Sequence, residues 1–239
     1  MFRRILALAT IFALAGCAQL DTRAILDGLG TAAPLDNATV IAGLKQALEV
    51  GTERTVGSTS TVDGFLGNAL IRLAVPEQFD EAADLLRRVG FGGQVDELEL
   101  SMNRAAELAS GEARGVFWDA IRGMSIADGF AILGGPEDAA TVYFRDKTES
   151  ELRRRFAPIV RDKMGEAGLY RKYEEITDIY NSLPLVEEPA LDLEAHVTDG
   201  ALDGLFTVLA QEEKRIREDP VARTTDLLKR VFGSRDGGR

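Results

Sequence analysis

The stretch DGALDGLFTVLAQEEKRIRE, residues 199–218, is the clearest guide to how this chain folds. Its large apolar side chains recur every three or four residues, at Leu202, Leu205, Phe206, Leu209 and Ile216. This spacing places them on one face of an α-helix, because the helix repeats every 3.6 residues. An apolar face of this kind needs a core to cover it. The stretch therefore predicts an amphipathic helix packed against other elements.

The same spacing recurs over most of the remaining chain. Further stripes follow Asp36 or Asn37, Pro76 and Asp219, which are residues that favour the start of a helix. Another runs over residues 169–183, before a loop between Pro184 and Pro189. The sequence therefore predicts an all-α protein.

Two local features interrupt this pattern. Near residues 69–75, Ile71, Leu73 and Val75 alternate with more polar positions, as in a short β-strand. Pro158 falls inside a helical stripe and should kink or split that helix. We therefore expect a single compact multi-helix domain over residues 37–233, with one short extended or β segment near residues 69–75.

The N-terminus is typical of an exported protein. Two arginines, Arg3 and Arg4, precede an apolar run from Ile5 to Ala15 that is too short to span a bilayer. The chain's only cysteine, Cys17, follows in Leu14-Ala15-Gly16-Cys17, which resembles a bacterial lipobox. That resemblance implies a signal peptide over residues 1–16, cleavage before Cys17 and acylation of its sulfur.

The residues after Cys17 predict where the protein resides. Residues 17–36 read as the acylated cysteine and a flexible tether, and residues 234–239 as a disordered tail. Position 18 is alanine, whereas aspartate there usually retains lipoproteins in the inner membrane of Gram-negative bacteria. In a Gram-negative organism we therefore expect a lipid anchor in the outer membrane, with the domain facing the periplasm.

The charge of the chain excludes one class of partner. There are 28 basic and 39 acidic residues, for a formal charge of −11. Removal of Arg3 and Arg4 leaves 26 against 39, or −13. A surface this acidic repels phosphate backbones, so we expect no nucleic-acid binding.

Three segments resemble a known family. They are the run Asp96-Glu97-Leu98-Glu99-Leu100-Ser101-Met102-Asn103-Arg104-Ala105-Ala106-Glu107, the run Asp138-Ala139-Ala140-Thr141-Val142-Tyr143-Phe144-Arg145, and residues 199–233. They resemble the bacterial family named domain of unknown function 4197. The resemblance implies an exported, mostly helical domain, and it implies no activity or functional residues.

The search for catalytic chemistry finds little. His196 is the only histidine, which excludes histidine-rich zinc sites, and we expect it at the surface or a helix end. No phosphate-binding loop, dinucleotide fingerprint or calcium loop occurs. We therefore expect no metal and no cofactor.

Two carboxylates stand out because helical geometry places them beside apolar stripes. Glu213 falls between Leu209 and Ile216, and Glu99 borders the stripe that contains Met102. A buried carboxylate needs a partner or a raised pKa, so these two are weak candidates for a general acid/base pair or a cation site. The alternative is that Glu213 lies beyond the core or pairs with an arginine, such as Arg104 or Arg145.

Five further residues are weak candidates for binding. Tyr170 and Tyr173 share a helix face that could line a groove or simply edge a core, and Trp118 lies away from its helix's apolar stripe. Asp63 and Asn68 belong to a long polar loop, and long loops are often functional.

These observations favour a membrane-anchored binding domain, for an envelope protein or a small ligand, over an enzyme. An envelope hydrolase or lyase is the alternative, and it requires Glu99 and Glu213 to share an open cleft. A structural spacer is a third hypothesis, and it predicts no concave pocket.

Overall fold

The structure is a computed structural model that describes residues 36–166, 168, 170, 171, 173–175, 178 and 192–219. Those residues belong to one compact unit. Cys17, most of the predicted tether, the Pro184–Pro189 loop, the last predicted helix and the tail lie outside the described residues.

The fold is all-α, as the sequence predicts, and the described residues contain no strand. The helices are α2 (Asn37–Thr59), α3 (Asp80–Arg88), α4 (Gly92–Ser110), α5 (Ala113–Gly123), α6 (Ile126–Gly134), α7 (Ala139–Glu166) and α9 (Leu193–Glu218), with a short 3-10 helix η1 (Glu77–Phe79) before α3. None of the described helices is both long and apolar enough to cross a membrane.

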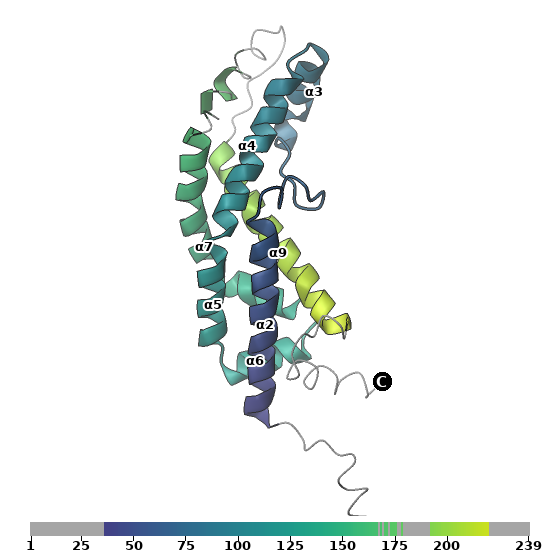
Figure 1. The fold of residues 1–239 in the computed structure, drawn as a ribbon, viewed down its shortest axis with the longest axis vertical. Helices are drawn as coiled ribbons and strands as arrows, with labels where there is room; N and C mark the ends of the chain where they lie inside the picture. The colour runs from purple at the N-terminus through teal and green to yellow at the C-terminus, as the bar shows by residue number, and fades with distance from the viewer. Residues whose placement is uncertain are drawn as a thin grey trace, which may run out of the picture. The chain divides into compact units, whose positions relative to one another are not determined.

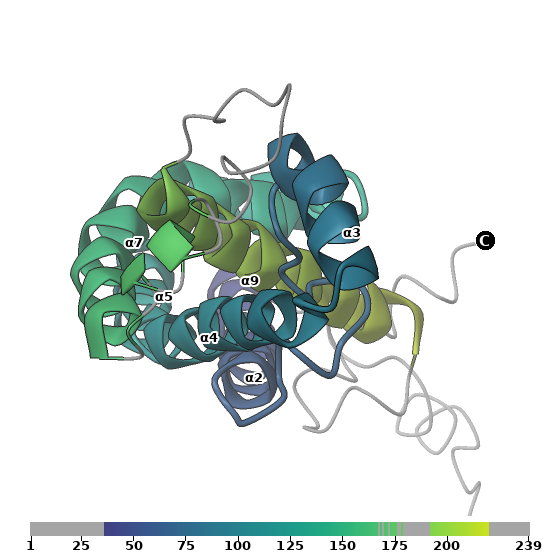
Figure 2. The ribbon, with the colours of Figure 1, turned by 90° about the horizontal axis from the view of Figure 1, so that it is seen from above.

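Helix α9, which contains the stretch 199–218, packs against α2, α4 and α7 (Figure 1). The view from above shows the same helix among these three (Figure 2). Its stripe is buried as expected, and Phe206 is 1% exposed. The Phe117 ring contacts the rings of both Phe144 and Phe206, with centroids 4.9 and 5.9 Å away. Burial of each such side chain contributes about 2 kcal/mol, which explains why the apolar spacing predicts this helix well.

Helix α2 begins where its capping chemistry predicts. The Oδ1 atom of Asp36 accepts a hydrogen bond from the backbone N–H of Thr39 at 2.7 Å. This bond satisfies one of the N–H groups that have no partner inside a helix. The prediction of a helix capped near Asp36 is confirmed.

The predicted extended segment near residues 69–75 is not a β-strand. It alternates as expected, since Ile71, Leu73 and Val75 are buried. However, residues 69–71 form turns, and the side chain of Asn103 takes the place of a neighbouring strand. The N–H of Leu73 donates to Asn103 Oδ1 at 2.9 Å, and Asn103 Nδ2 donates to the carbonyl oxygen of Leu73 at 2.7 Å.

Two glycines of α9 allow this segment and the preceding Phe65 to approach the helix closely. A Cβ atom on Gly204 would lie 2.5 Å from Cε1 of Phe65, and one on Gly200 would lie 2.5 Å from Cδ2 of Leu73. These distances are too short for real atoms, so glycine is required for the close approach.

Pro158 does not split its helix. Helix α7 runs from Ala139 to Glu166 through the proline. The side chains of Phe156 and Val160 on either side are fully buried. Their packing compensates for the hydrogen bond that the proline removes.

Candidate functional site

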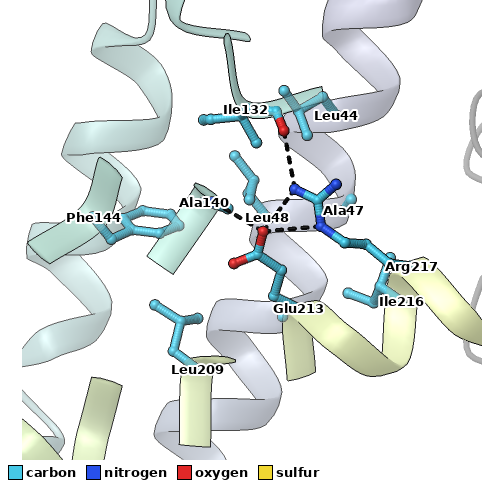
Figure 3. A pocket seen from close by; sticks show the side chains of 11 residues that line it. Leu44, Ala47, Leu48, Ile132, Ala140, Phe144, Leu209, Glu213, Ile216 and Arg217 are labelled. Carbon is cyan, nitrogen blue, oxygen red and sulfur yellow. Dashed lines mark hydrogen bonds and ion pairs between the residues drawn. The ribbon is translucent and has the colours of Figure 1, made fainter. Parts of the chain in front are cut away.

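A small cavity lies where α2, α6, α7 and α9 meet, and Glu213 and Arg217 are its charged residues (Figure 3). Its remaining lining is apolar or small and includes Leu44, Ile132 and Phe144. The cavity volume is about 30 Å³. Since one water molecule needs about 10–15 Å³ by the same measure, this space is large enough for water but too small for a metabolite.

Glu213 caps the start of α7 from across the fold. Its Oε1 accepts the N–H of Ala140 at 2.9 Å, and its Oε2 accepts the N–H and the hydroxyl of Thr141, each at 2.8 Å. These N–H groups lie in the first turn of α7, where the positive end of the helix dipole favours an anion. The carboxylate therefore serves as a helix cap.

Arg217 joins this cap to α6. Its Nη2 atom donates to Glu213 Oε1 at 2.7 Å and to the carbonyl oxygen of Ile132 at 3.0 Å. The Glu213 and Arg217 side chains are 7% and 16% exposed. Glu213 therefore has an arginine partner, as expected, but the partner is Arg217. Arg145 pairs with Glu149 and Asp203 instead.

Glu99 is also held by arginines. Arg72 donates to its Oε2 at 3.0 Å and Arg87 to its Oε1 at 3.1 Å. Arg104, the other partner considered from sequence, binds Glu107 instead at 2.7 Å. Glu99 does not line the cavity around Glu213, and the two carboxylates share no hydrogen-bond partner among the described residues.

Helix α4 carries a stripe of buried polar side chains, of which the sequence singled out only Glu99. It consists of Glu99, Asn103 and Glu107, spaced four residues apart. Glu107 Oε1 accepts the N–H groups of Phe65 and Leu66 at 3.2 and 3.3 Å. The four-residue spacing of polar side chains beside an apolar stripe is the signal that could have revealed it.

Asp63 and Asn68, the candidates in the polar loop of residues 58–68, form hydrogen bonds that stabilise the loop itself. Asp63 has a positive φ of 65° and binds Arg104 through Oδ1 at 2.7 Å. Asn68 Oδ1 accepts the N–H of Leu70 at 3.1 Å, which stabilises a turn. Both side chains therefore position the loop.

The aromatic candidates lie at helix contacts. The half-buried Trp118 of α5 donates from Nε1 to Glu53 Oε1 of α2 at 3.1 Å. The ring centroid of Tyr173 lies 5.5 Å from that of Phe79.

Tyr170 is exposed, and its hydroxyl lies 3.4 Å from Glu194 Oε2. Burial raises the pKa of the Tyr170 phenol, and the charge of Glu194 adds to this effect. The cavity around Glu213 is not lined by Glu99, by Trp118 or by the loop residues 58–68. The sequence candidates do not converge there.

His196 lies in the first turn of α9, half-buried, with Nε2 3.1 Å from the carbonyl oxygen of Ala74. The prediction of a helix-end position is confirmed. Among the described residues, no group of three or more histidine, cysteine, aspartate or glutamate side chains could hold a metal ion.

A larger cleft lies between α5 and α7, with the start of α6 at one side. Its volume is about 360 Å³, and its lining comprises Val116, Asp119, Ala120, Gly123, Asp128, Tyr143, Lys147, Thr148, Glu151 and Arg155. We call it the α5–α7 cleft. Binding sites for small molecules commonly reach this size, whereas the cavity around Glu213 does not.

The polar groups of the α5–α7 cleft come from a ladder on α7 that sequence reasoning missed. Tyr143, Lys147, Glu151 and Arg155 follow one another at intervals of four residues. That spacing places them along one helix face. Periodicity alone indicates a solvated face, because it does not show that α5 and α6 provide an opposite wall.

The pKa values of two groups that line the cleft are shifted from their ordinary values. Hydrogen bonds from Ser125 hold the pKa of Asp128 below its ordinary value, and the charge of Lys147 lowers it further. Burial raises the pKa of the Tyr143 hydroxyl, and Asp128 adds to this effect. The hydroxyl of Tyr143 donates to the carbonyl oxygen of Ala120 at 3.2 Å, which ties the two walls together.

The family model described as "Protein of unknown function (DUF4197)" matches residues 34–233. No curated protein and no solved structure matches the chain. The family match spans well over half of the sequence and includes every helix described above. The resemblance seen in the sequence is confirmed, and the chain belongs to the DUF4197 family.

Proposed function

We propose that this protein is a lipoprotein of the outer membrane that faces the periplasm and binds a small ligand or an envelope protein through its helical domain. The α5–α7 cleft carries the binding part of this proposal, because it is a concave polar site of about 360 Å³.

The anchoring part rests on the sequence. Arg3 and Arg4, the apolar run and Leu14-Ala15-Gly16-Cys17 stand in the order of a lipoprotein signal. Each buried CH₂ of an acyl chain contributes about 0.8 kcal/mol, so two or three chains on Cys17 would hold the protein stably in a bilayer.

The geometry favours binding over the alternative of a hydrolase or lyase. A general acid or base needs access to substrate and a proton to exchange. Glu99 and Glu213 are each buried against arginines, and Glu213 is committed to the first turn of α7. The α5–α7 cleft also favours binding over a structural spacer, since a spacer needs no concave site.

Anchoring is tested by growing cells that express the protein with labelled palmitate and separating their two membranes. Wild type should incorporate label and sediment with the outer membrane, whereas Cys17→Ser should take up no label. Ala18→Asp is the matched control, which should remain acylated but move to the inner membrane. Equal processing and equal sedimentation of wild type and Cys17→Ser would overturn the anchor.

Binding is tested on the full chain with ligand panels and purified envelope extracts. A specific partner in a pulldown, or a thermal shift with a small molecule, would support the proposal. The absence of both would contradict it.

A further inference from the structure

Two residues of opposite charge line the α5–α7 cleft without forming an ion pair with each other. Its lining includes three carboxylates, Asp119, Asp128 and Glu151, and two cationic groups, Lys147 and Arg155. Arg155 Nε binds Glu151 at 2.7 Å, and Asp119 binds Arg122 outside the cleft. Asp128 and Lys147 are therefore the charged residues of this cleft that form no ion pair with the residues that the structure describes.

Lys147 has unused capacity as a cation. Within the described part of the chain, no carboxylate lies within 4.0 Å of its ammonium group. Its nearest aromatic contact is the ring of Tyr143, 5.9 Å from Nζ to the centroid. An ammonium group carries three donors, so Lys147 can bind an anion from the cleft.

Asp128 has unused capacity as an anion. Its Oδ2 atom accepts the N–H of Ser125 at 3.0 Å and the hydroxyl at 2.7 Å, which fixes the carboxylate in the capping box of α6. Its Oδ1 atom accepts no hydrogen bond from the described residues. One edge of a rigid carboxylate is thus free to accept a cation.

The charges of Asp128 and Lys147 interact electrostatically although the two side chains form no ion pair. The charge of Lys147 contributes to the low pKa of Asp128, although their N–O separation exceeds 4.0 Å. A gap between two opposite charges is filled best by a ligand that carries both charges. A lone anion would be repelled by the carboxylates, and a lone cation by Lys147.

We propose that the α5–α7 cleft binds a small zwitterion, with its anionic group on Lys147 and its ammonium group on Asp128. The inference rests on the binding function proposed above and names the chemistry of the ligand. A short peptide with free ends and a phosphoethanolamine headgroup share this chemistry, and the volume of the cleft suits either.

The α5 wall offers a direct way to close the site. Gly123 lines the cleft, and a Cβ atom added to it would meet nothing within 4 Å, so a leucine there is expected to reduce the space in the cleft. Gly115 on the same helix also has open space around it, but it does not line the cleft. Gly123→Leu and Gly115→Leu are therefore a matched pair.

The experiment is calorimetric titration of the full chain with trialanine and with glycerophosphoethanolamine. Blocked trialanine, acetate and ethanolamine are the controls that carry neither charge or only one. Wild type should bind at least one zwitterion and bind the controls much more weakly. Lys147→Gln and Asp128→Asn should each weaken binding by about tenfold or more, since each removes a charge-assisted contact. Gly123→Leu should abolish binding, and Gly115→Leu should bind as wild type.

Binding of trialanine alone would assign a peptide ligand, and binding of glycerophosphoethanolamine alone would assign a headgroup; both results support the inference. No binding of either zwitterion to folded wild type would overturn it, as would equal binding to Gly123→Leu. In those cases the palmitate experiment and the envelope pulldown still decide the proposed function separately.

Discussion

Glu213 and Thr141 are joined by two hydrogen bonds although they stand 72 residues apart in the chain. The backbone N–H and the hydroxyl of Thr141 both donate to Oε2 of Glu213, each at 2.8 Å. One carboxylate therefore fixes the start of α7 against α9, next to its ion pair with Arg217.

Substitution of this carboxylate should destabilise the fold. Glu213→Gln keeps the shape but removes the charge, so Arg217 is left buried without its ion pair, and we expect a loss of about 3 kcal/mol. Urea unfolding followed by circular dichroism measures the change. Glu218→Gln is the control, because Glu218 is exposed and lies 3.8 Å from Lys214; it should cost about 0.5 kcal/mol or less. Equal losses in the two variants would contradict the capping role.

The pairing of Asn103 with the backbone of Leu73 should be equally sensitive. Asn103→Leu leaves the buried N–H and carbonyl oxygen of Leu73 without partners, at a cost of about 3 kcal/mol. The Leu73 amide should then exchange hydrogen faster in deuterated buffer. Ser101→Ala on the same helix should change neither quantity by much, since its hydroxyl donates to the carbonyl oxygen of Glu97 within the helix at an exposed position. Unchanged exchange at Leu73 in Asn103→Leu would refute this pairing.

Adding one methyl group at Gly204 should cost stability. The new Cβ would lie 2.5 Å from the fully buried ring of Phe65, so packing strain of about 1–3 kcal/mol should exceed the gain in helix propensity. Gly57→Ala is the matched control in α2, where a Cβ meets nothing within 4 Å, and it should stabilise by about 0.5–1 kcal/mol. Thermal unfolding of both variants tests whether each substitution lowers or raises the Tm as expected. A more stable Gly204→Ala variant would show that the packing between Gly204 and Phe65 accommodates a methyl group.

Acid should selectively remove the contribution of the Asp36 cap. Hydrogen bonds from Thr39 hold the pKa of Asp36 below its ordinary value in the folded state. A group whose pKa is lower when folded stabilises the protein above its unfolded pKa, and this stability is lost as pH falls through the folded pKa. Asp36→Ser keeps a cap of similar strength that does not titrate.

The difference in Tm between wild type and Asp36→Ser should therefore be constant near neutral pH. It should shift against wild type as pH falls from about 5 toward 2. A difference that does not change with pH would show that the charge of Asp36 contributes nothing.

The helices were predictable because their causes are local. A cap such as Asp36 and its partner Thr39 lie within one helical turn, and the apolar stripe of α9 repeats with the helix period. The alternation near Leu73 corresponds to alternate burial, since Ile71, Leu73 and Val75 are buried. The inference of a strand failed because the partner is a side chain on α4, and alternation does not reveal what satisfies the backbone.

The carboxylates were placed correctly and their chemistry was left open. Helical geometry puts Glu213 beside an apolar stripe, but the choice between a reactive acid and a structural anion depends on Thr141 and Arg217. The nearer of these partners, Arg217, is one helical turn away, and the other is in a different helix.

Amino-acid order alone therefore accounts for the helical class of this protein, the start of its first described helix and the positions of the buried carboxylates Glu99 and Glu213 beside apolar stripes. Those features depend on contacts within a few residues. The α5–α7 cleft depended on packing, because Asp128 and Lys147 come from separate helices and each looks like an ordinary surface charge by itself. Only the folded chain brings both into the lining of one cleft, since no local interaction sets the distance between two helices.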